Sequence, residues 1–469
     1  MATPLPKLQL FLTLLIQLSE PVMAVVIYPF ITRAIRRTGI TKGDEQKTGY
    51  WAGIIESLFF VSETLSVYHW GHASDFYGRR PILLIGPLGL TLAVLGFGLS
   101  QSFWGMAVSR AAMGVFNGNI GVSKTVMAES TDESNRADAF ALMPIALVLG
   151  TTVGHSRPAI GGLLADPAAR WPYIFGKLAF FKEFPWFLSC SAAGLISFAA
   201  FVLSYWGLKE TLPSKAKQKR IEAAPLLDDS ETFPSYGSVQ NSEPTPEPLS
   251  SPEATPSSVQ SLLGDSRLRT TLTSLGFLAF THMAYESLLP LVYTTSIPVG
   301  GLGLSPYQVG VILGIFGLFN GFWNWLVLTK VLKKLGPRKT LTLFYAFFLL
   351  HFALLWILRD AAFNAGRITP HIWALFVFQL FVSAVIPTAF NANFLLIVKN
   401  APPNALGSVN GLAQIISSGT RGVAPVFASS LFSYSLESRF AGGHLVEIVL
   451  CGVTIVGICC ISRLPSTSS

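Results

Sequence analysis

The stretch that decides the fold is Gly71-His72-Ala73-Ser74-Asp75-Phe76-Tyr77-Gly78-Arg79-Arg80-Pro81. It separates two apolar runs, at about residues 50–70 and 82–100, and each run is long enough to cross the hydrocarbon core of a bilayer. Its glycines permit a tight turn and a close approach of helices, and its acidic and basic residues place charge at the helix ends. We therefore expect a short charged turn between two membrane-spanning helices.

The rest of the chain has the composition of a membrane protein. Of its 469 residues, 51% are hydrophobic and 12% are charged, whereas soluble proteins devote about 25% of their residues to charge. The apolar residues form long runs rather than strict alternations, which favours helices over a β-barrel. Twelve spans are expected, at about residues 8–32, 50–70, 82–100, 103–127, 138–164, 186–207, 270–295, 306–328, 340–358, 371–398, 407–433 and 445–462. The predicted fold is an all-α polytopic membrane protein with twelve transmembrane helices.

The distribution of charge indicates an orientation and excludes several functions. Lys and Arg gather in the loops that lie on the same side as both termini, which places the termini in the cytoplasm. The formal charge of +8 then reflects topology, so no nucleic-acid partner is expected. The four cysteines lie in apolar stretches without a CxxC pattern, so neither a metal site nor a disulfide framework is expected. No HExxH or GxSxG pattern occurs, so the protein is not expected to be an enzyme and needs no cofactor.

A polar interval divides the spans into two sets of six. Residues 209–265 begin with a basic cluster and continue as SEPTPEPLSSPEATPSS, a composition that cannot bury enough apolar area to offset the entropy of ordering. We expect a disordered cytoplasmic linker between an N-terminal bundle, residues 1–208, and a C-terminal bundle, residues 266–469. The turn after the eighth span, KVLKKLGPRKT, repeats the pattern of the first turn, which indicates an internal duplication.

The spacing of Gly71, Asp75, Gly78, Arg79 and Arg80 resembles the signature GxLxDxxGRRxxL between the second and third helices of the major facilitator superfamily. This resemblance implies transport by two six-helix bundles that rock around a midplane cavity. It also implies that these five residues act as a conformational latch, which locks the bundles by charge and helix-terminus contacts.

Two further motifs extend the resemblance. The fourth span contains Arg110-Ala111-Ala112-Met113-Gly114, which is similar to the RxxxG pattern of proton-linked members. The fifth span resembles the motif of exporters and antiporters through Gly150, Gly154, Pro158, Gly161 and Gly162, although Arg157 stands where the family carries glycine. With the segments 53–63 and 400–414, the chain is most similar to the eukaryotic, fungal-type drug:proton antiporter branch and to zinc-induced-facilitator-like proteins.

Ionisable groups inside spans are candidates for proton coupling because their burial in a membrane is expensive. They are Glu20, Glu56, Glu63, Arg110 and Glu286. Burial favours the neutral form of a carboxyl group, which a reversible proton carrier requires. Glu20 and Glu286 are expected near the cavity, with Arg110 as their charge partner. Glu56 and Glu63 have a packing or helix-pairing role as the alternative.

Polar and aromatic residues inside spans are candidates for the substrate cavity. They are Asn117, His282, Tyr285, Asn320, Asn324, Gln379, Asn391 and Asn410. Amides and aromatic rings bind organic molecules by stacking, shape and a few directed hydrogen bonds. The alternative for each amide is an interhelical hydrogen bond, which contributes about 0.6 kcal/mol.

The predicted function is proton-coupled export of a small organic compound across the plasma membrane or the vacuolar membrane. The expected partners are the substrate, protons and the lipid bilayer, and the expected functional unit is a monomer. Two alternatives remain open, a proton symporter or uniporter of the same fold and a transporter-like receptor that binds a ligand without moving it.

Overall fold

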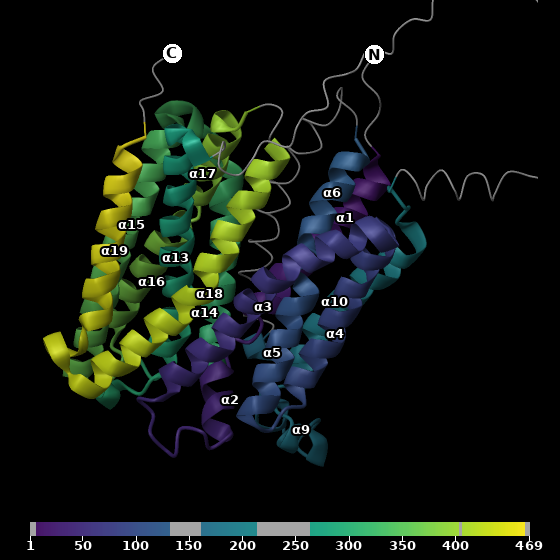
Figure 1. Ribbon diagram of the computed structural model, residues 1–469. Helices are drawn as coiled ribbons and strands as arrows, with labels where there is room; N and C mark the ends of the chain where they lie inside the picture. Colours follow the sequence, from purple (N-terminus) through teal and green to yellow (C-terminus); the bar gives the residue numbers. More distant parts are fainter. Residues whose placement is uncertain (1–5, 132–160, 213–262, 403–405, 465–469) are drawn as a thin grey trace, which may run out of the picture.

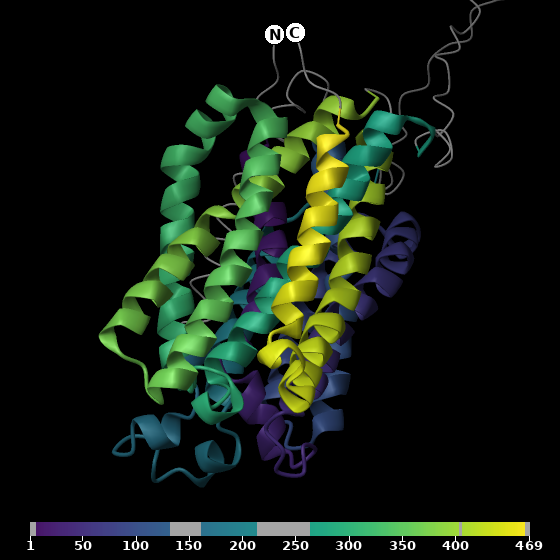
Figure 2. The same cartoon turned by 90° about the vertical axis from the view of Figure 1, so that its left-hand side faces the viewer.

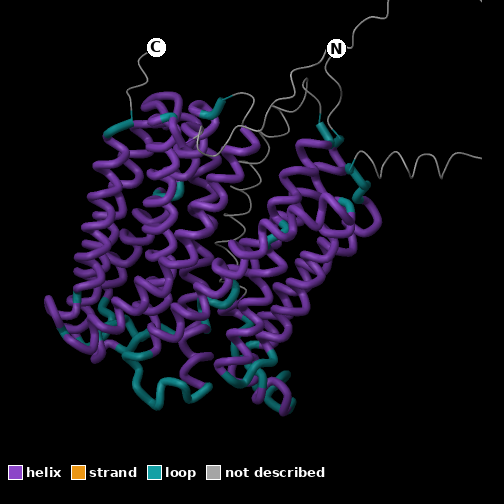
Figure 3. The backbone as a smooth tube through the Cα atoms, viewed as in Figure 1, coloured by secondary structure: helices purple, strands orange, loops and turns teal. Residues whose placement is uncertain are grey.

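The computed structural model describes residues 6–131, 161–212, 263–402 and 406–464, and within these ranges the chain is helical apart from turns (Figures 1 and 3). Up to residue 212 the helices are α1 (Lys7–Val25), α2 (Ile31–Arg37), α3 (Thr48–Tyr77), α4 (Arg79–Gly98), α5 (Phe103–Asn117), α6 (Ile120–Glu129), α8 (Pro167–Arg170), α9 (Ala179–Glu183) and α10 (Phe187–Gly207). From residue 263 they are α13 (Ser266–Thr294), η1 (Ile297–Val299), α14 (Pro306–Trp323), the π-helical turn η2 (Asn324–Leu328), α15 (Thr329–Ala365), α16 (Pro370–Val385), α17 (Thr388–Asn400), α18 (Leu406–Ser438), η4 (Phe440–Gly443) and α19 (Leu445–Ser462).

The helices agree with the predicted spans in position but not in continuity. Eight helical segments of the described chain are long and apolar enough to cross a membrane, whereas most of the predicted fifth span lies outside the described residues. The first predicted span is broken, since α1 ends at Val25 and a turn over residues 26–30 precedes α2. Pro29 explains the break, because proline lacks an N–H and disfavours helical geometry at Tyr28 before it. The fourth span is broken at Gly118 and the tenth at Pro387.

The two halves of the chain lie side by side and meet mainly at one end (Figure 1). We call the end at which α1 begins and α19 ends the terminal end, and the opposite one the far end. In Figure 1 the halves converge towards the far end and diverge towards the terminal end.

Small residues allow α3 of the N-terminal half to pack closely against α18 of the C-terminal half. A Cβ on Gly49 would lie 2.3 Å from Ser433 Oγ, and one on Gly53 would lie 2.8 Å from the carbonyl oxygen of Pro425. Further along, the Val426 N–H donates to Ser57 Oγ (3.1 Å), and Ser418 Oγ donates to Glu63 (3.3 Å). The helices are thus antiparallel, and these contacts run from the far end of α3 to its middle.

The two halves repeat one turn in backbone detail. Gly78 between α3 and α4 has φ 102° and ψ 158°, and Gly336 at the kink within α15 has φ 73° and ψ 161°. Both conformations favour glycine. Two residues later in each half an arginine caps the last helix of its bundle, Arg80 at the Tyr205 carbonyl (2.6 Å) and Arg338 at the Ser462 carbonyl (2.7 Å). The internal duplication inferred from the sequence is therefore present in the structure.

Candidate functional site

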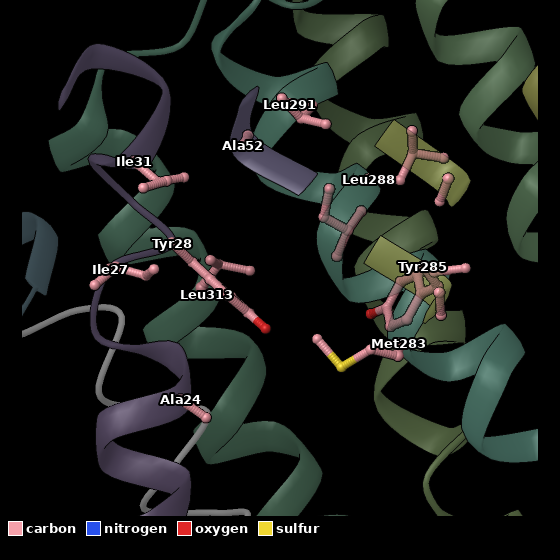
Figure 4. Packing of buried hydrophobic residues seen from close by; sticks show 14 of the residues in the cluster. Ala24, Ile27, Tyr28, Ile31, Ala52, Met283, Tyr285, Leu288, Leu291 and Leu313 are labelled. Atoms are coloured by element: carbon pink, nitrogen blue, oxygen red, sulfur yellow. The ribbon is translucent and has the colours of Figure 1, made fainter. Parts of the chain in front are cut away.

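The most polar part of the junction between the halves is the central cluster, which consists of Tyr28, Glu56, Arg110, Tyr285, Glu286 and Ser287. Tyr28 comes from the turn between α1 and α2, and Tyr285 comes from α13 in the other half. Figure 4 shows their side chains pointing toward one another across the junction. Both are buried, and neither hydroxyl has a hydrogen bond of good geometry with a described residue.

Glu56 is a carboxyl group placed between the two halves. Its side chain is 1% exposed on α3, and it interacts electrostatically with Arg110 and with Glu286 across the junction. Ser287 Oγ approaches it from α13, but neither carboxylate oxygen of Glu56 has a well-formed hydrogen bond with a described residue. A fully buried carboxylate is costly in its charged form. Glu56 is therefore a candidate for reversible protonation at the junction between the halves.

Arg110 is held by the backbone at the end of α1. Its Nη1 donates to the Met23 carbonyl (2.8 Å) and its Nη2 to the Ala24 carbonyl (2.8 Å). The guanidinium lies over the Phe59 ring, 4.5 Å from its centroid, and the residue is fully buried. Arg110 was expected to be a charge partner of Glu20 and Glu286, whereas the structure pairs its guanidinium with backbone carbonyl groups and places Glu56 within electrostatic reach. Arg110 thereby fastens α5 to the broken first span beside Glu56.

Replacing Arg110 should destabilise the fold. In Arg110→Met the carbonyl groups of Met23 and Ala24 lose their donors, and each unsatisfied buried group costs about 1–3 kcal/mol. We expect a lower midpoint of thermal unfolding in detergent. Arg367→Met provides the matched control, since Arg367 is exposed and such surface substitutions change stability by about 0.5 kcal/mol at most. Equal unfolding temperatures for the two variants would contradict this role.

On α13 the cavity candidate His282 lies beside the coupling candidate Glu286. His282 Nδ1 lies 3.6 Å from Glu286 Oε2, and the imidazole contacts the rings of Tyr285 and Phe390. The neighbouring Tyr285 lies with its ring edge on His351, at 4.6 Å between centroids. Glu286, which was expected near the cavity, thus belongs to the central cluster together with Tyr285.

A buried polar network stands behind Tyr285, and sequence reasoning missed its centre, His351. The imidazole Nδ1 lies 2.8 Å from Ser383 Oγ and 3.1 Å from Gln379 Nε2, and Tyr293 Oη donates to Gln379 Oε1 (3.1 Å). All four side chains are fully buried. Gln379, a cavity candidate, is therefore occupied within the C-terminal half and braces the ring that supports Tyr285.

The remaining amide candidates form bonds within one half or lie outside the described part. Asn320 Nδ2 donates to the Ala384 carbonyl, and Asn391 Nδ2 donates to the Pro387 carbonyl (3.4 Å). Asn117 is buried beside the α3 contact, and its Nδ2 has no partner among the described residues. The side chains of Glu20, Asn324 and Asn410, and the residues Gly150, Gly154 and Pro158, lie outside the described part of the chain.

The two described glycines of the fifth-span motif lie at close helix contacts. A Cβ on Gly161 would lie 2.3 Å from the Val26 carbonyl oxygen, in the turn that carries Tyr28. A Cβ on Gly162 would lie 2.5 Å from the Pro306 carbonyl oxygen at the start of α14, in the other half. These glycines therefore allow the end of the fifth span to fit between the two halves.

The charged turn after α3 makes its contacts within the N-terminal half. Arg79 pairs with Asp75 and with Glu129 of α6 (3.0 Å), and the backbone N–H groups of Arg79 and Arg80 donate to the Glu210 carboxylate (2.8 and 3.2 Å). A Cβ on Gly71 would have nothing described within 4 Å. The bridge to the C-terminal half expected from the sequence is not formed with any described residue in this conformation.

The sequence analysis did not predict two groups of charged residues at the far end. Glu45 accepts from the backbone N–H and Oγ of Ser296 in the other half (2.9 Å each) and pairs with Arg36 (2.8 Å). Arg359 and Glu447 form a buried ion pair inside the C-terminal half. The predicted ninth span ended at residue 358, so Arg359 was placed outside it.

Among the described residues, no His, Cys, Asp or Glu side chains gather in a group that could hold a metal ion.

The chain is similar to proteins named as major facilitator transporters and to a protein named as a zinc-induced facilitator. The chain is 30% identical to the major facilitator-type transporter psiT2 of Psilocybe cyanescens, over 97% of this chain and 90% of that protein. It is 26% identical to the multidrug transporter mfsB of Aspergillus fumigatus, over 96% and 82% of the two chains. It is 29% identical to Zinc Induced Facilitator 1 of Arabidopsis thaliana, over 97% and 90%.

A solved structure and a family model agree with these relatives. The crystal structure of a D-xylose-proton symporter superimposes with a TM-score of 0.67 at 14% identity, covering 98% of both chains. The likeness shows a shared fold of twelve helices in two bundles. The family model of the Major Facilitator Superfamily matches residues 10–425. Sequence motif, internal duplication, fold and family match thus agree, and the chain belongs to the Major Facilitator Superfamily of membrane transporters.

Proposed function

We propose that this transporter exports a small organic compound in exchange for protons, and that Glu56 carries the proton. The observation that carries the proposal is the position of Glu56, a fully buried carboxyl group between the two halves, with Ser287 of the other half beside it. Both halves cover this group in one conformation, and their separation would uncover it. Such a group can bind a proton on one side of the membrane and release it on the other.

The geometry of the central cluster explains how protonation of Glu56 would be linked to closure of the far end. Tyr28 and Glu56 belong to one half, whereas Tyr285, Glu286 and Ser287 belong to the other. A charged Glu56 is attracted by Arg110 of its own half and repelled by Glu286 of the other half, in a medium that screens poorly. Separation of the halves at the far end relieves this repulsion because it admits water. A neutral Glu56 favours closure there.

The residue pairing between α3 and α18 supports a second conformation, in which the halves would meet at the terminal end instead of the far end. Gly49 faces Ser433 and Val61 faces Gly422, so each step towards the terminal end on α3 matches an equal step back on α18. Continued to the terminal end, this register would place Gly71 beside Gly411, and neither has anything described within 4 Å of a built Cβ. Asp75 would then meet the first turn of α18, where the helix dipole favours a negative charge. This contact is the latch that we assign to the charged turn.

The latch makes a prediction for Asp75→Asn. Loss of the charge removes its attraction to the start of α18, and turnover should fall by up to about tenfold, since such contacts contribute about 0.3–1 kcal/mol and more when partly buried. Binding of the compound should change little, because Asp75 lies far along α3 from Glu56. Transport rate and equilibrium binding are measured on the same preparation. Asp44→Asn, which removes an exposed carboxylate paired with Lys47, should match wild type. An unaltered rate for Asp75→Asn would refute the latch.

The direction of transport and the class of substrate are inferred from the charges of the loops and from the names of the relatives. The charge bias of the loops supports cytoplasmic termini, so that a compound taken up at the open terminal end would leave at the far end. The names of the relatives, among them a multidrug transporter, support export of an organic compound. We assign the protein to the plasma membrane or the vacuolar membrane. One chain supplies both sides of the central cluster, so we propose a functional monomer.

Transport into reconstituted vesicles tests the proposal. A panel of organic amines, acids and neutral compounds is offered to vesicles with an imposed pH difference. We expect at least one compound to accumulate inside protein-containing vesicles whose lumen is more acidic than the medium, well above its passive trapping in protein-free vesicles, and this accumulation should collapse with a protonophore. Uptake that only equalises the concentrations and is insensitive to the pH difference would indicate a uniporter, and binding without uptake would indicate a receptor. Either result would overturn the proposal.

A further inference from the structure

A strongly aromatic strap crosses the far end of the N-terminal half. It comprises residues 165–186, includes the short helices α8 and α9, and appears in Figure 2 as the blue-green segment at the lower left. Its rings form a continuous series in which Phe175, Phe180 and Phe181 occupy the centre, with centroids 4.9 Å and 5.3 Å apart. The strap is therefore an ordered aromatic surface.

The strap is fastened to the N-terminal half along its second part. Arg37 Nη2 donates to the Lys182 carbonyl (2.6 Å), Gln101 Nε2 donates to the Glu183 carboxylate (2.8 Å), and the Trp186 ring stacks on Phe30 at 5.1 Å. One residue reaches the other half, since the Arg170 guanidinium lies 3.5 Å from the centroid of the Tyr307 ring. These attachments hold the strap in place without covering it.

Large apolar side chains of the strap remain uncovered. Tyr173 is 94% exposed, Ile174 66%, Leu178 50% and Phe180 40%. The strap runs directly into α10, which begins at Phe187. The exposed residues Leu195 and Phe198 of α10 continue the apolar surface. Helix α10 spans the membrane, so the strap lies where its span begins, at the depth that aromatic residues favour at a membrane surface.

The basic residues around the strap identify the kind of surface. Arg33, Lys177 and Lys182 are exposed at the far end, and none of them forms an ion pair with a described residue. With cytoplasmic termini, as proposed above, these residues lie on the non-cytoplasmic side of the membrane. Loops on that side normally contain fewer Lys and Arg residues. Exposed aromatic and aliphatic groups flanked by surplus cations fit the interface of a bilayer that contains anionic lipids.

We propose that the strap is a lipid-binding element, whose apolar residues enter the bilayer surface at the far end while Lys177 and Lys182 contact anionic headgroups. The aromatic and aliphatic side chains supply insertion, and the lysines supply the preference for negative charge. The element is distinct from the central cluster, and lipid binding would persist in a variant that no longer transports.

A depth measurement on the full-length protein tests this inference. A fluorophore is attached to Ile174→Cys, after Cys451, Cys459 and Cys460 have been replaced by alanine, and the buried Cys190 is retained. The matched control carries the fluorophore at Lys42→Cys, an exposed turn of the same half. Vesicles contain phosphatidylcholine with or without phosphatidylglycerol, and either lipid can carry bromine as a quencher.

We expect brominated lipid to quench the fluorophore at residue 174 several-fold more than that at residue 42, and brominated phosphatidylglycerol to quench it most. Lys177→Gln and Lys182→Gln should each lower the preference for phosphatidylglycerol about fivefold, the equivalent of about 1 kcal/mol per basic residue near an anionic surface. Equal quenching at residues 174 and 42 would overturn the insertion. An unchanged lipid preference in the lysine variants would overturn the headgroup contact. Quenching at residue 174 that falls as the protein-to-lipid ratio rises would indicate a second copy of the chain in place of lipid.

Discussion

Glu56→Gln should uncouple transport from protons without unfolding the protein. Glutamine retains the size of the side chain and is neutral, so it mimics the protonated form that fits the closed junction. We expect the pH-driven accumulation of substrate to fall by about tenfold or more, because a permanently neutral side chain cannot carry a proton between the two sides. Exchange of labelled for unlabelled compound, which needs no net proton movement, should continue.

Glu63→Gln is the matched control for this experiment. Glu63 lies seven residues along α3 from Glu56, is also buried, and accepts a hydrogen bond from Ser418 of the other half (3.3 Å). An amide oxygen can accept the same bond, so coupling should survive. If Glu63→Gln loses coupling while Glu56→Gln retains it, the carrier has been assigned to the wrong carboxyl group. If both variants retain coupling, neither residue carries the proton.

Gly53→Ala should bias the protein away from the conformation that is closed at the far end. The added Cβ would lie 1.8 Å from Ser429 Oγ and 2.8 Å from the Pro425 carbonyl oxygen. The hydroxyl can rotate away, but the backbone cannot, so α3 and α18 must separate. Such overpacking costs about 1–3 kcal/mol, which shifts the balance between conformations by about 5- to 150-fold. We expect slower turnover and a far end that is more often open.

Spin labels at Lys42 and Arg439, exposed residues of the two halves, measure this opening as a longer distance. Gly419→Ala is the matched control on α18, because a Cβ there would have nothing described within 4 Å. Both substitutions raise helix propensity by about 1 kcal/mol, so a difference between them reports the contact alone. A distance distribution for Gly53→Ala that equals that of Gly419→Ala would contradict close packing as the basis of closure.

The sequence predicted the elements whose signals are local. Apolar runs located the spans, the turn around Gly78 indicated the family, and the repeat at Gly336 predicted a duplication that the backbone angles bear out. Arg110 stood out because an arginine inside an apolar run is costly. Gly114, the glycine of the same motif, lies at a close helix contact, since a Cβ there would lie 2.1 Å from the Phe59 carbonyl oxygen.

The composition of the central cluster could not be predicted in the same way. Glu56 meets Ser287, more than two hundred residues away, and that encounter depends on how α3 and α13 are rotated within their halves. Tyr28 lies in a break of the first span, inside a run that reads as continuously apolar. His351 looks like any core histidine until Gln379 and Ser383 are brought against it. Sequence reasoning favoured Glu20 and Glu286 over Glu56. The side chain of Glu20 lies outside the described part of the chain and Glu286 lies beside Glu56, and we propose Glu56 as the carrier for its buried position between the halves.

The most direct test of proton-coupled export through Glu56 is the movement of protons that substrate itself drives. Vesicles containing the wild-type protein are loaded with a pH-sensitive dye, and a transported compound is added outside without an imposed pH difference. The account predicts that the lumen becomes more alkaline as the compound enters, and that Glu56→Gln abolishes the change. A lumen that becomes more acidic, which would mean symport, or one whose pH does not change while the compound enters, would contradict it.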